Sequence, residues 1–240
     1  TGIMAGSPCP QEIMQRGSGR MHMSEITLCY GMTETAPVSA QSSTEDSVEQ
    51  RVSTVGRVHP HLEVKIVDES GKVVPRGQLG ELCVRGYSVM LGYWEDQDKT
   101  QEVIDTARWM HTGDIAEMDD EGFVKIKGRI KDVVIRGGEN LFPKEIEDFL
   151  YTHPAVSDVQ VIGVPDHKYG EELCACIILH ENDPCTEDVI REYCAEHISH
   201  NKVPRYVRFF HEFPMTASGK AQKFKLREFM REELNLKEIA

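Results

Sequence analysis

Hydrophobic and polar residues alternate in short runs along the first half of the chain, with glycine-bearing turns between them. Residues 62–67 (Leu-Glu-Val-Lys-Ile-Val) have a period of two, which predicts a half-buried strand, and the turn residues Asp68–Gly71 follow. Helical periodicity is rarer here, and its best example runs from Asp96 to Ile104. Further strands are predicted at residues 80–86, 114–118 and 122–127, the last two as a hairpin.

Apolar positions three and four apart become common after residue 140, and they predict helices between the strands. Pro143 stands where a helix favours its first residue, and Thr186 has the side chain of an N-cap for a helix over about 187–198. The other predicted elements are strands at 156–164, 173–179 and 206–213 and a basic helix from about residue 223. This alternation predicts an α+β domain of about a hundred residues, preceded by a boundary near 128–132.

Composition narrows the class of protein. The 240 residues carry a formal charge of −13, and 40 % of them are hydrophobic, as in globular chains. The pI near 5.2 argues against nucleic-acid binding through general phosphate attraction, and no run approaches the ~18 apolar residues of a membrane span. Seven scattered cysteines, an odd number, favour reduced thiols and an intracellular protein over a disulfide framework.

Four polar segments that contain glycine combine residue types that bind nucleotides. In Tyr30–Glu34 a ring can stack on a purine, a hydroxyl can bond a phosphate and a carboxylate can hold Mg²⁺. Thr112–Asp114 ends in a carboxylate suited to two vicinal ribose hydroxyls, and Pro214–Lys220 is a loop of small residues that presents one lysine. Gly128–Asp132 is a charged cluster at the predicted boundary. A segment of this kind taken alone is more often an ordinary turn. The occurrence of all four in this order favours a functional site.

The chain resembles the C-terminal portion of the adenylate-forming acyl-CoA synthetases, a superfamily that includes fatty-acyl and aryl-CoA ligases, luciferases and peptide-synthetase adenylation domains. The resemblance covers essentially all 240 residues. Five motifs stand in the family's order: Tyr30–Glu34, Gly80–Tyr93, Thr112–Asp114, Gly128–Glu147 and Pro214–Lys220. Details such as Cys174–Ile177 and Ile198–His200 are similar to the medium-chain fatty-acyl group called acyl-CoA synthetase family member 2.

The resemblance implies a mixed α/β and α+β fold. Residues 1–130 would be the β-rich C-terminal part of the large AMP-binding domain, and residues 131–240 the small mobile domain. The nucleotide site would include Tyr30 and Gly31 against adenine, with the segment that begins Ala5-Gly6 at its border. Thr33 would contact the α-phosphate, and Glu34 would help to bind Mg²⁺.

The remaining roles also follow from the resemblance. Asp114 would hold the ribose hydroxyls with help from Arg129, and Lys131 would be the hinge of the small domain. Lys220 matches the mobile lysine that bridges the acyl carboxylate and phosphate oxygens during adenylation. Gly137 and Gly138 match a hairpin that faces the pantetheine of coenzyme A, although a plain hairpin turn explains them equally well.

The implied activity is ATP-dependent adenylation of a fatty acid, expected to be medium-chain, followed by transfer to coenzyme A. Two alternatives stay open: another acyl acceptor, such as a carrier protein or oxygen, and a non-catalytic nucleotide-binding module. Four retained residues disfavour the module: Glu34, Asp114, Arg129 and Lys220. The location implied is bacterial cytoplasm or mitochondrial matrix.

The chain differs from the family in one respect: it lacks the loop that cradles the ATP β- and γ-phosphates. We therefore expect the chain to start inside the large domain, and expect these 240 residues alone not to catalyse adenylation.

Other features carry weaker expectations. Residues 201–231 hold eight Lys and Arg against two Glu, which gives mild support for an anionic ligand there. The pairs His59/His61 and His197/His200 have no partner at zinc spacing, so zinc binding there is disfavoured. Cys174 and Cys176 would share one strand face, which predicts core packing rather than redox chemistry.

Overall fold

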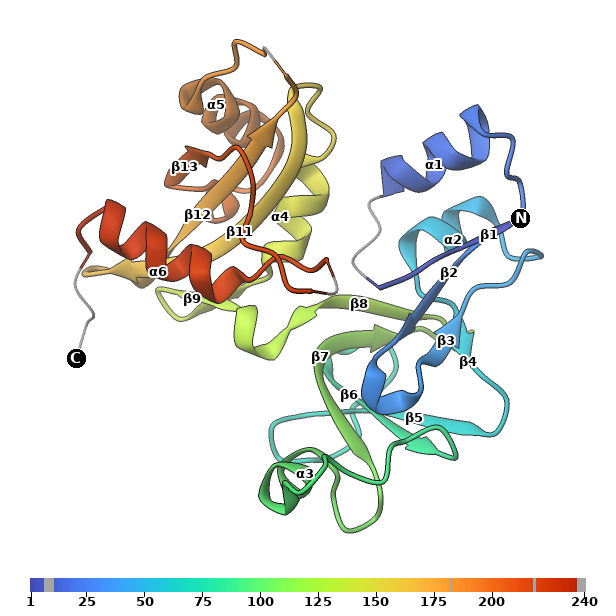
Figure 1. The fold of residues 1–240 in the computed structure, drawn as a ribbon. Coiled ribbons are helices and arrows are strands. Elements are labelled where there is room, and N and C mark those ends of the chain that lie inside the picture. The colour runs from blue at the N-terminus through green and yellow to red at the C-terminus, as the bar shows by residue number, and fades with distance from the viewer. Residues whose placement is uncertain (7–10, 182, 218, 237–240) are drawn as a thin grey trace. The chain divides into compact units, whose positions relative to one another are not determined.

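The computed structural model describes residues 1–6, 11–181, 183–217 and 219–236, which divide into two units, Thr1–Ile130 and Lys131–Ala240 (Figure 1). Cys9, Ser218 of the lysine loop, and Ser7 and Pro8 of the segment expected beside adenine lie outside the described residues. The expected mixed fold, rich in strands in the first unit, is confirmed. No helix in the described ranges is long and apolar enough to cross a membrane.

The first unit begins with a sheet in which only the first two strands are parallel. Its strands, in spatial order, are β1 (Gly2–Met4), β2 (Ile26–Gly31), β3 (Val38–Gln41) and β4 (Arg57–Val58). Because β1 and β2 run in parallel, with Met4 beside Leu28, their carboxyl ends meet at one edge. Ala5 and Gly6 therefore come to the same edge as Tyr30 and Gly31.

Two helices that the sequence pattern does not predict cover this sheet. They are α1 (Gln11–Arg20) and α2 (Val48–Ser53). Met14 of α1 and Val52 of α2 form one apolar cluster with Ile26 and Leu28 of β2. A 3₁₀ turn, η1 (Thr33–Thr35), follows β2 directly.

The second sheet of this unit is an antiparallel meander, as its alternating pattern predicts. Its strands are β5 (Leu62–Val67), β6 (Gly80–Gly86), β7 (Met110–Met118) and β8 (Val124–Arg129). Asp68 closes the first turn by accepting from the Ser70 N–H at 2.8 Å. The predicted helix is α3 (Gln97–Val103), with Asp96 as N-cap. Tyr30 packs against the core of this sheet beside Ile66 and Leu82.

The second unit is a sheet with helices on both faces (Figure 1). Its strands are β9 (Val134–Arg136), β10 (Glu139–Leu141), β11 (Val156–Asp166), β12 (Gly170–Leu179) and β13 (Tyr206–Phe209), and its helices are α4 (Pro143–Leu150), α5 (Glu187–His197) and α6 (Lys223–Glu233). The predicted elements are confirmed, although β13 ends four residues before the predicted 213. Short 3₁₀ turns lie at η2 (Ile130–Asp132) and η3 (His200–Lys202).

The period of two along β12 separates the two faces of this sheet. Leu173, Ala175 and Ile177 pack with α4 and α5, whereas Cys174 and Cys176 pack with α6. Both cysteines are fully buried, so their predicted core role is confirmed.

Candidate active site

Tyr30, Asp114 and Arg129 form a connected polar cluster on the first unit. The Tyr30 hydroxyl donates to Asp114 Oδ2 at 2.5 Å, and Arg129 Nε lies 3.3 Å from Asp114 Oδ1. The pairing of β7 with β8 places Asp114 opposite Arg129, so the hairpin itself brings them together. The Asp114 side chain is only 10 % exposed, and burial, reinforced by Asp114, raises the pKa of Tyr30. The phenol therefore stays a neutral donor to the carboxylate.

Glu34 has a comparable tyrosine partner. The Tyr93 hydroxyl donates to Glu34 Oε1 at 2.8 Å, and burial and this hydrogen bond raise the pKa of Tyr93 to about 12. The Tyr93 backbone N–H donates to Thr100 Oγ1 at 2.8 Å, which ties the Tyr93 backbone to α3. Tyr93 is the last residue of the motif Gly80–Tyr93, but the sequence alone assigned no role to its side chain.

The path of the chain between Tyr30 and Glu34 requires a glycine. A Cβ atom on Gly31 would lie 1.5 Å from the Pro37 carbonyl oxygen, so any other residue would force β2 and β3 apart at this point. The chain can then turn at once into η1, where the Thr33 side chain is exposed and Glu34 is half-buried. Ala5 and Gly6 are exposed at the end of β1, and Gly6 has φ +91°.

Lys220 lies on the second unit, in a loop closed by its own hydrogen bonds. The Lys220 N–H donates to Thr216 Oγ1 at 3.0 Å, and the Thr216 N–H donates to the Lys220 carbonyl at 2.8 Å. Within the described part of the chain the exposed Lys220 ammonium group has no hydrogen-bond or ion-pair partner. The loop therefore fixes the backbone and leaves the charged group available.

An ion pair anchors the helix that follows this loop. Lys223 Nζ lies 2.6 Å from Glu147 Oε1, which also accepts from the Val161 N–H at 2.7 Å. The sequence gave no signal for this pair, because its members are 76 residues apart.

The Lys131 and Gly137-Gly138 segments both lie in the second unit. Lys131 is exposed, and its carbonyl accepts from Arg227, which also pairs with Asp132 at 2.8 Å. Gly137 and Gly138 have φ values of 60° and 86° and join Arg136 to Glu139, which makes a two-residue hairpin turn. The turn geometry alone accounts for both glycines.

The basic excess in residues 201–231 is largely paired with carboxylates. Five of the eight basic residues pair with carboxylates that all lie outside this segment, and Arg208 pairs with two of them, Glu187 and Glu233. The other four pairs are Lys202–Glu145, Arg205–Asp166, Lys223–Glu147 and Arg227–Asp132. Whether this segment binds an anionic ligand stays a prediction. The count alone did not reveal these pairs, because most of the acidic partners are distant in sequence.

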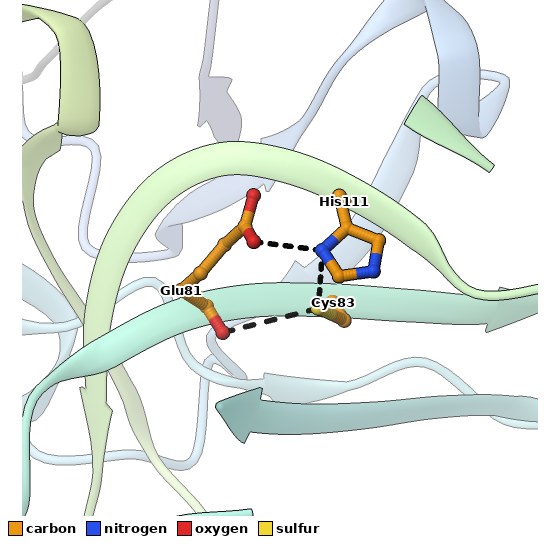
Figure 2. Close-up of side chains that lie close together, drawn as sticks. All are labelled: Glu81, Cys83 and His111. Carbon is orange, nitrogen blue, oxygen red and sulfur yellow. Dashed lines mark hydrogen bonds and ion pairs between the residues drawn. The ribbon is translucent and has the colours of Figure 1, made fainter. Parts of the chain in front are cut away.

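A further polar group, not predicted from the sequence, lies between β6 and β7. It consists of Glu81, Cys83 and His111 (Figure 2). His111 Nδ1 is 2.7 Å from Glu81 Oε2 and 3.5 Å from Cys83 Sγ.

Comparison with known proteins identifies the family. Residues 1–94 match the model of the AMP-binding enzymes, and residues 145–220 match that of the AMP-binding enzyme C-terminal domain. The chain belongs to the AMP-binding enzymes. Tyr30, Glu34 and Lys220 fall within the two matched segments, whereas Asp114 and Arg129 lie between them.

Individual AMP-binding enzymes are similar over almost the whole chain. The medium-chain acyl-CoA ligase ACSF2, mitochondrial, of Bos taurus is 52 % identical over 236 residues, which are 98 % of this chain and 38 % of the relative. The ATP-bound MatB of Rhodopseudomonas palustris is 31 % identical, with a TM-score of 0.88 over 96 % of this chain and 45 % of that one. The anthranilate CoA ligase AuaEII in complex with anthranoyl-AMP is 30 % identical, with a TM-score of 0.88 over 98 % and 45 %. The chain thus spans about two fifths of the curated relative's length.

Proposed function

We propose that the protein carrying this chain is an AMP-forming acyl-CoA synthetase that activates a fatty acid, medium-chain by preference. The observation that carries the proposal is the nearly buried Asp114 carboxylate, held by Tyr30 and Arg129. The similarity to an acyl-CoA ligase, an ATP-bound enzyme and an acyl-adenylate complex supports the same reaction class.

The nucleoside would bind where β1 and β2 end. Tyr30 and Gly31 would border the adenine on one side, and Ala5 and Gly6, which reach the same sheet edge, on the other. Tyr30 and Arg129 orient the Asp114 carboxylate, which would accept hydrogen bonds from the ribose hydroxyls. Arg129 would add positive charge beside the nucleotide.

The phosphates would lie near η1. Thr33 offers an exposed hydroxyl to the α-phosphate. Glu34 fits Mg²⁺, because it is a half-buried hard-oxygen ligand whose Oε1 is oriented by Tyr93. When bound, Mg²⁺ would neutralise phosphate oxygens during attack by the acyl carboxylate.

Lys220 would supply the second positive charge of this step. The carboxylate and the α-phosphate are both anions, so an ammonium group that contacts both lowers the barrier to the mixed anhydride. The unpartnered Lys220 ammonium group on a fixed loop suits that role. Lys131 would act as the hinge, and Gly137 and Gly138 would face the coenzyme A arm in the thioester-forming step.

A reducing compartment is part of the proposal. The six cysteines that the structure describes are all free, and an acyl-CoA product forms where coenzyme A is present. A bacterial cytoplasm or a mitochondrial matrix meets both conditions, and the Bos taurus relative is itself named as mitochondrial.

The test separates the two half-reactions in the natural full-length protein. Lys220→Ala should lower the rate of acyl-AMP formation by about 10²–10³-fold, because one stabilising charge is lost from the transition state. The same variant, supplied with acyl-AMP and coenzyme A, should form thioester within about 3-fold of the unaltered rate.

Lys225→Ala is the matched control, since Lys225 is another exposed lysine five residues further on. It should leave both half-reactions unchanged. Equal loss of both half-reactions in Lys220→Ala, or no loss in either, would contradict the proposed role of Lys220.

A further inference from the structure

The pairing of β7 with β6 is irregular at the residues that place Asp114. Glu81 pairs with Ile115 and Cys83 with His111, so the three residues Thr112–Asp114 face the single residue Leu82 of β6. The bulge needs a left-handed residue, and Gly113 has φ +69°. Such a bulge removes regular ladder hydrogen bonds from the segment that must hold Asp114 in place.

Side chains replace the lost ladder bonds. Glu81 Oε1 accepts from the Gly113 N–H at 3.0 Å, and Glu81 Oε2 accepts from His111 Nδ1 at 2.7 Å (Figure 2). The Thr112 hydroxyl donates to the Leu82 carbonyl at 2.7 Å and accepts from the Asp114 N–H at 3.2 Å. One carboxylate thus holds both His111, which precedes the bulge, and Gly113, its central residue.

We infer that Glu81, together with His111, is a positioning residue for nucleotide binding: it fixes the bulge Thr112–Asp114 and thereby the direction of the Asp114 carboxylate. This inference rests on the proposed ribose-binding role of Asp114. Glu81 itself lies on β6 with both oxygens directed at the bulge, so it acts through Asp114 rather than on the nucleotide.

A metal ion is the other use that this group of side chains suggests. The donor atoms of Glu81, Cys83 and His111 lie within 4.8 Å of one another. However, both Glu81 oxygens already accept hydrogen bonds, and burial, reinforced by Glu81, raises the pKa of the Cys83 thiol to about 12. A cysteine binds a metal ion as its thiolate, and the Glu81 oxygens would have to give up their hydrogen bonds, so the hydrogen-bonded arrangement is favoured.

The experiment compares ATP with 2′-deoxyATP as substrates of the natural full-length protein. A carboxylate bonded to the 2′-hydroxyl should give the unaltered protein a preference for ATP of about 10–100-fold in kcat/KM. Asp114→Ala should abolish this preference. Glu81→Ala should raise the KM for ATP about 10-fold, leave kcat within about 3-fold, and lower the preference toward that of Asp114→Ala.

Conservative variants separate positioning from general stability. Glu81→Gln keeps an oxygen for the Gly113 N–H and should retain the preference within about 2-fold. Glu81→Asp is one methylene shorter and cannot span both partners, so it should lose part of the preference even if Glu81→Ala fails to fold. Glu117→Ala is the matched control, because Glu117 lies on β7, the strand that carries the bulge, and pairs with Lys127 instead.

The outcomes are distinguishable. If Asp114→Ala keeps the preference for ATP, the proposed ribose site is wrong, and this inference falls with it. If Asp114→Ala loses the preference while Glu81→Ala and Glu81→Asp keep it, only the positioning inference is overturned. A rise in thermal stability with added Zn²⁺ that Cys83→Ser abolishes would also overturn it, in favour of a metal site.

Discussion

Two tyrosine hydroxyls hold the two carboxylates of the candidate site. Tyr30 donates to Asp114, and Tyr93 donates to Glu34, across 84 and 59 residues of sequence. Each carboxylate is thereby oriented before any ligand arrives, which reduces the ordering that binding requires. In both pairs the tyrosine must remain protonated, because only the phenol can donate.

The raised pKa of Tyr93 can be measured directly. A tyrosine whose folded pKa lies above its unfolded value of about 10 adds stability below pH 10, and that stability is lost as the pH rises through the folded value of about 12. The absorbance of the unaltered protein minus that of Tyr93→Phe, followed near 295 nm, should therefore show little tyrosinate at pH 11. A complete tyrosinate signal by pH 11 would contradict the Glu34–Tyr93 contact.

The proposed site residues are easier to recognise in the sequence than the residues that position them. Asp114 and Lys220 stand in short local motifs, so their type and spacing are visible in the chain. Tyr93, Glu81 and Glu147 act through contacts made across strands and helices, which local spacing does not encode. For the same reason the sequence did not reveal the ion pairs of the basic residues near the C-terminus.

At the scale of elements, α6 matters because it directly follows the Lys220 loop. Its first residue, Lys223, reaches Glu147 on α4 and the Val161 carbonyl on β11. The Lys223 and Glu147 side chains are 17 % and 10 % exposed, so this ion pair is largely screened from water. The pair therefore fixes where the lysine loop ends.

Breaking this pair on one side should be costly. Lys223→Ala leaves the Glu147 carboxylate largely buried without its cation, and should lower the free energy of unfolding by about 3 kcal/mol. The double variant Glu147→Gln/Lys223→Met removes both charges and keeps an acceptor for the Val161 N–H, so it should cost less than Lys223→Ala. Urea unfolding measures both values, and an equal or larger loss in the double variant would contradict this account.

The sequence pattern did not predict α1 and α2, because neither is a strong helix by itself. Helix α1 contains Gly17 and Gly19, which weaken helix propensity, and α2 has only six residues. Both depend on packing Met14 and Val52 against β2. Strand β5 was predicted because its apolar and polar residues alternate, and β12 because its continuous apolar run stands out against the neighbouring turns.

At the scale of the whole molecule, each unit has its own core. In the second unit, α4 and α5 pack on one face of the sheet and α6 on the other, which gives two apolar clusters. We therefore expect residues 131–240, expressed alone, to unfold cooperatively. Amide hydrogen exchange should show the strongest protection in β11 and β12, and a chain that lacks protected amides would contradict an independent second unit.

The most direct test of the account is AMP release by the natural full-length protein, with ATP, Mg²⁺ and a series of fatty acids, with and without coenzyme A. We predict AMP release that depends on coenzyme A and is fastest with one chain length among the medium-chain acids. Slow acyl-AMP formation that coenzyme A does not accelerate would contradict it and indicate another acceptor. The absence of any nucleotide turnover would instead favour a module that binds nucleotides without catalysis.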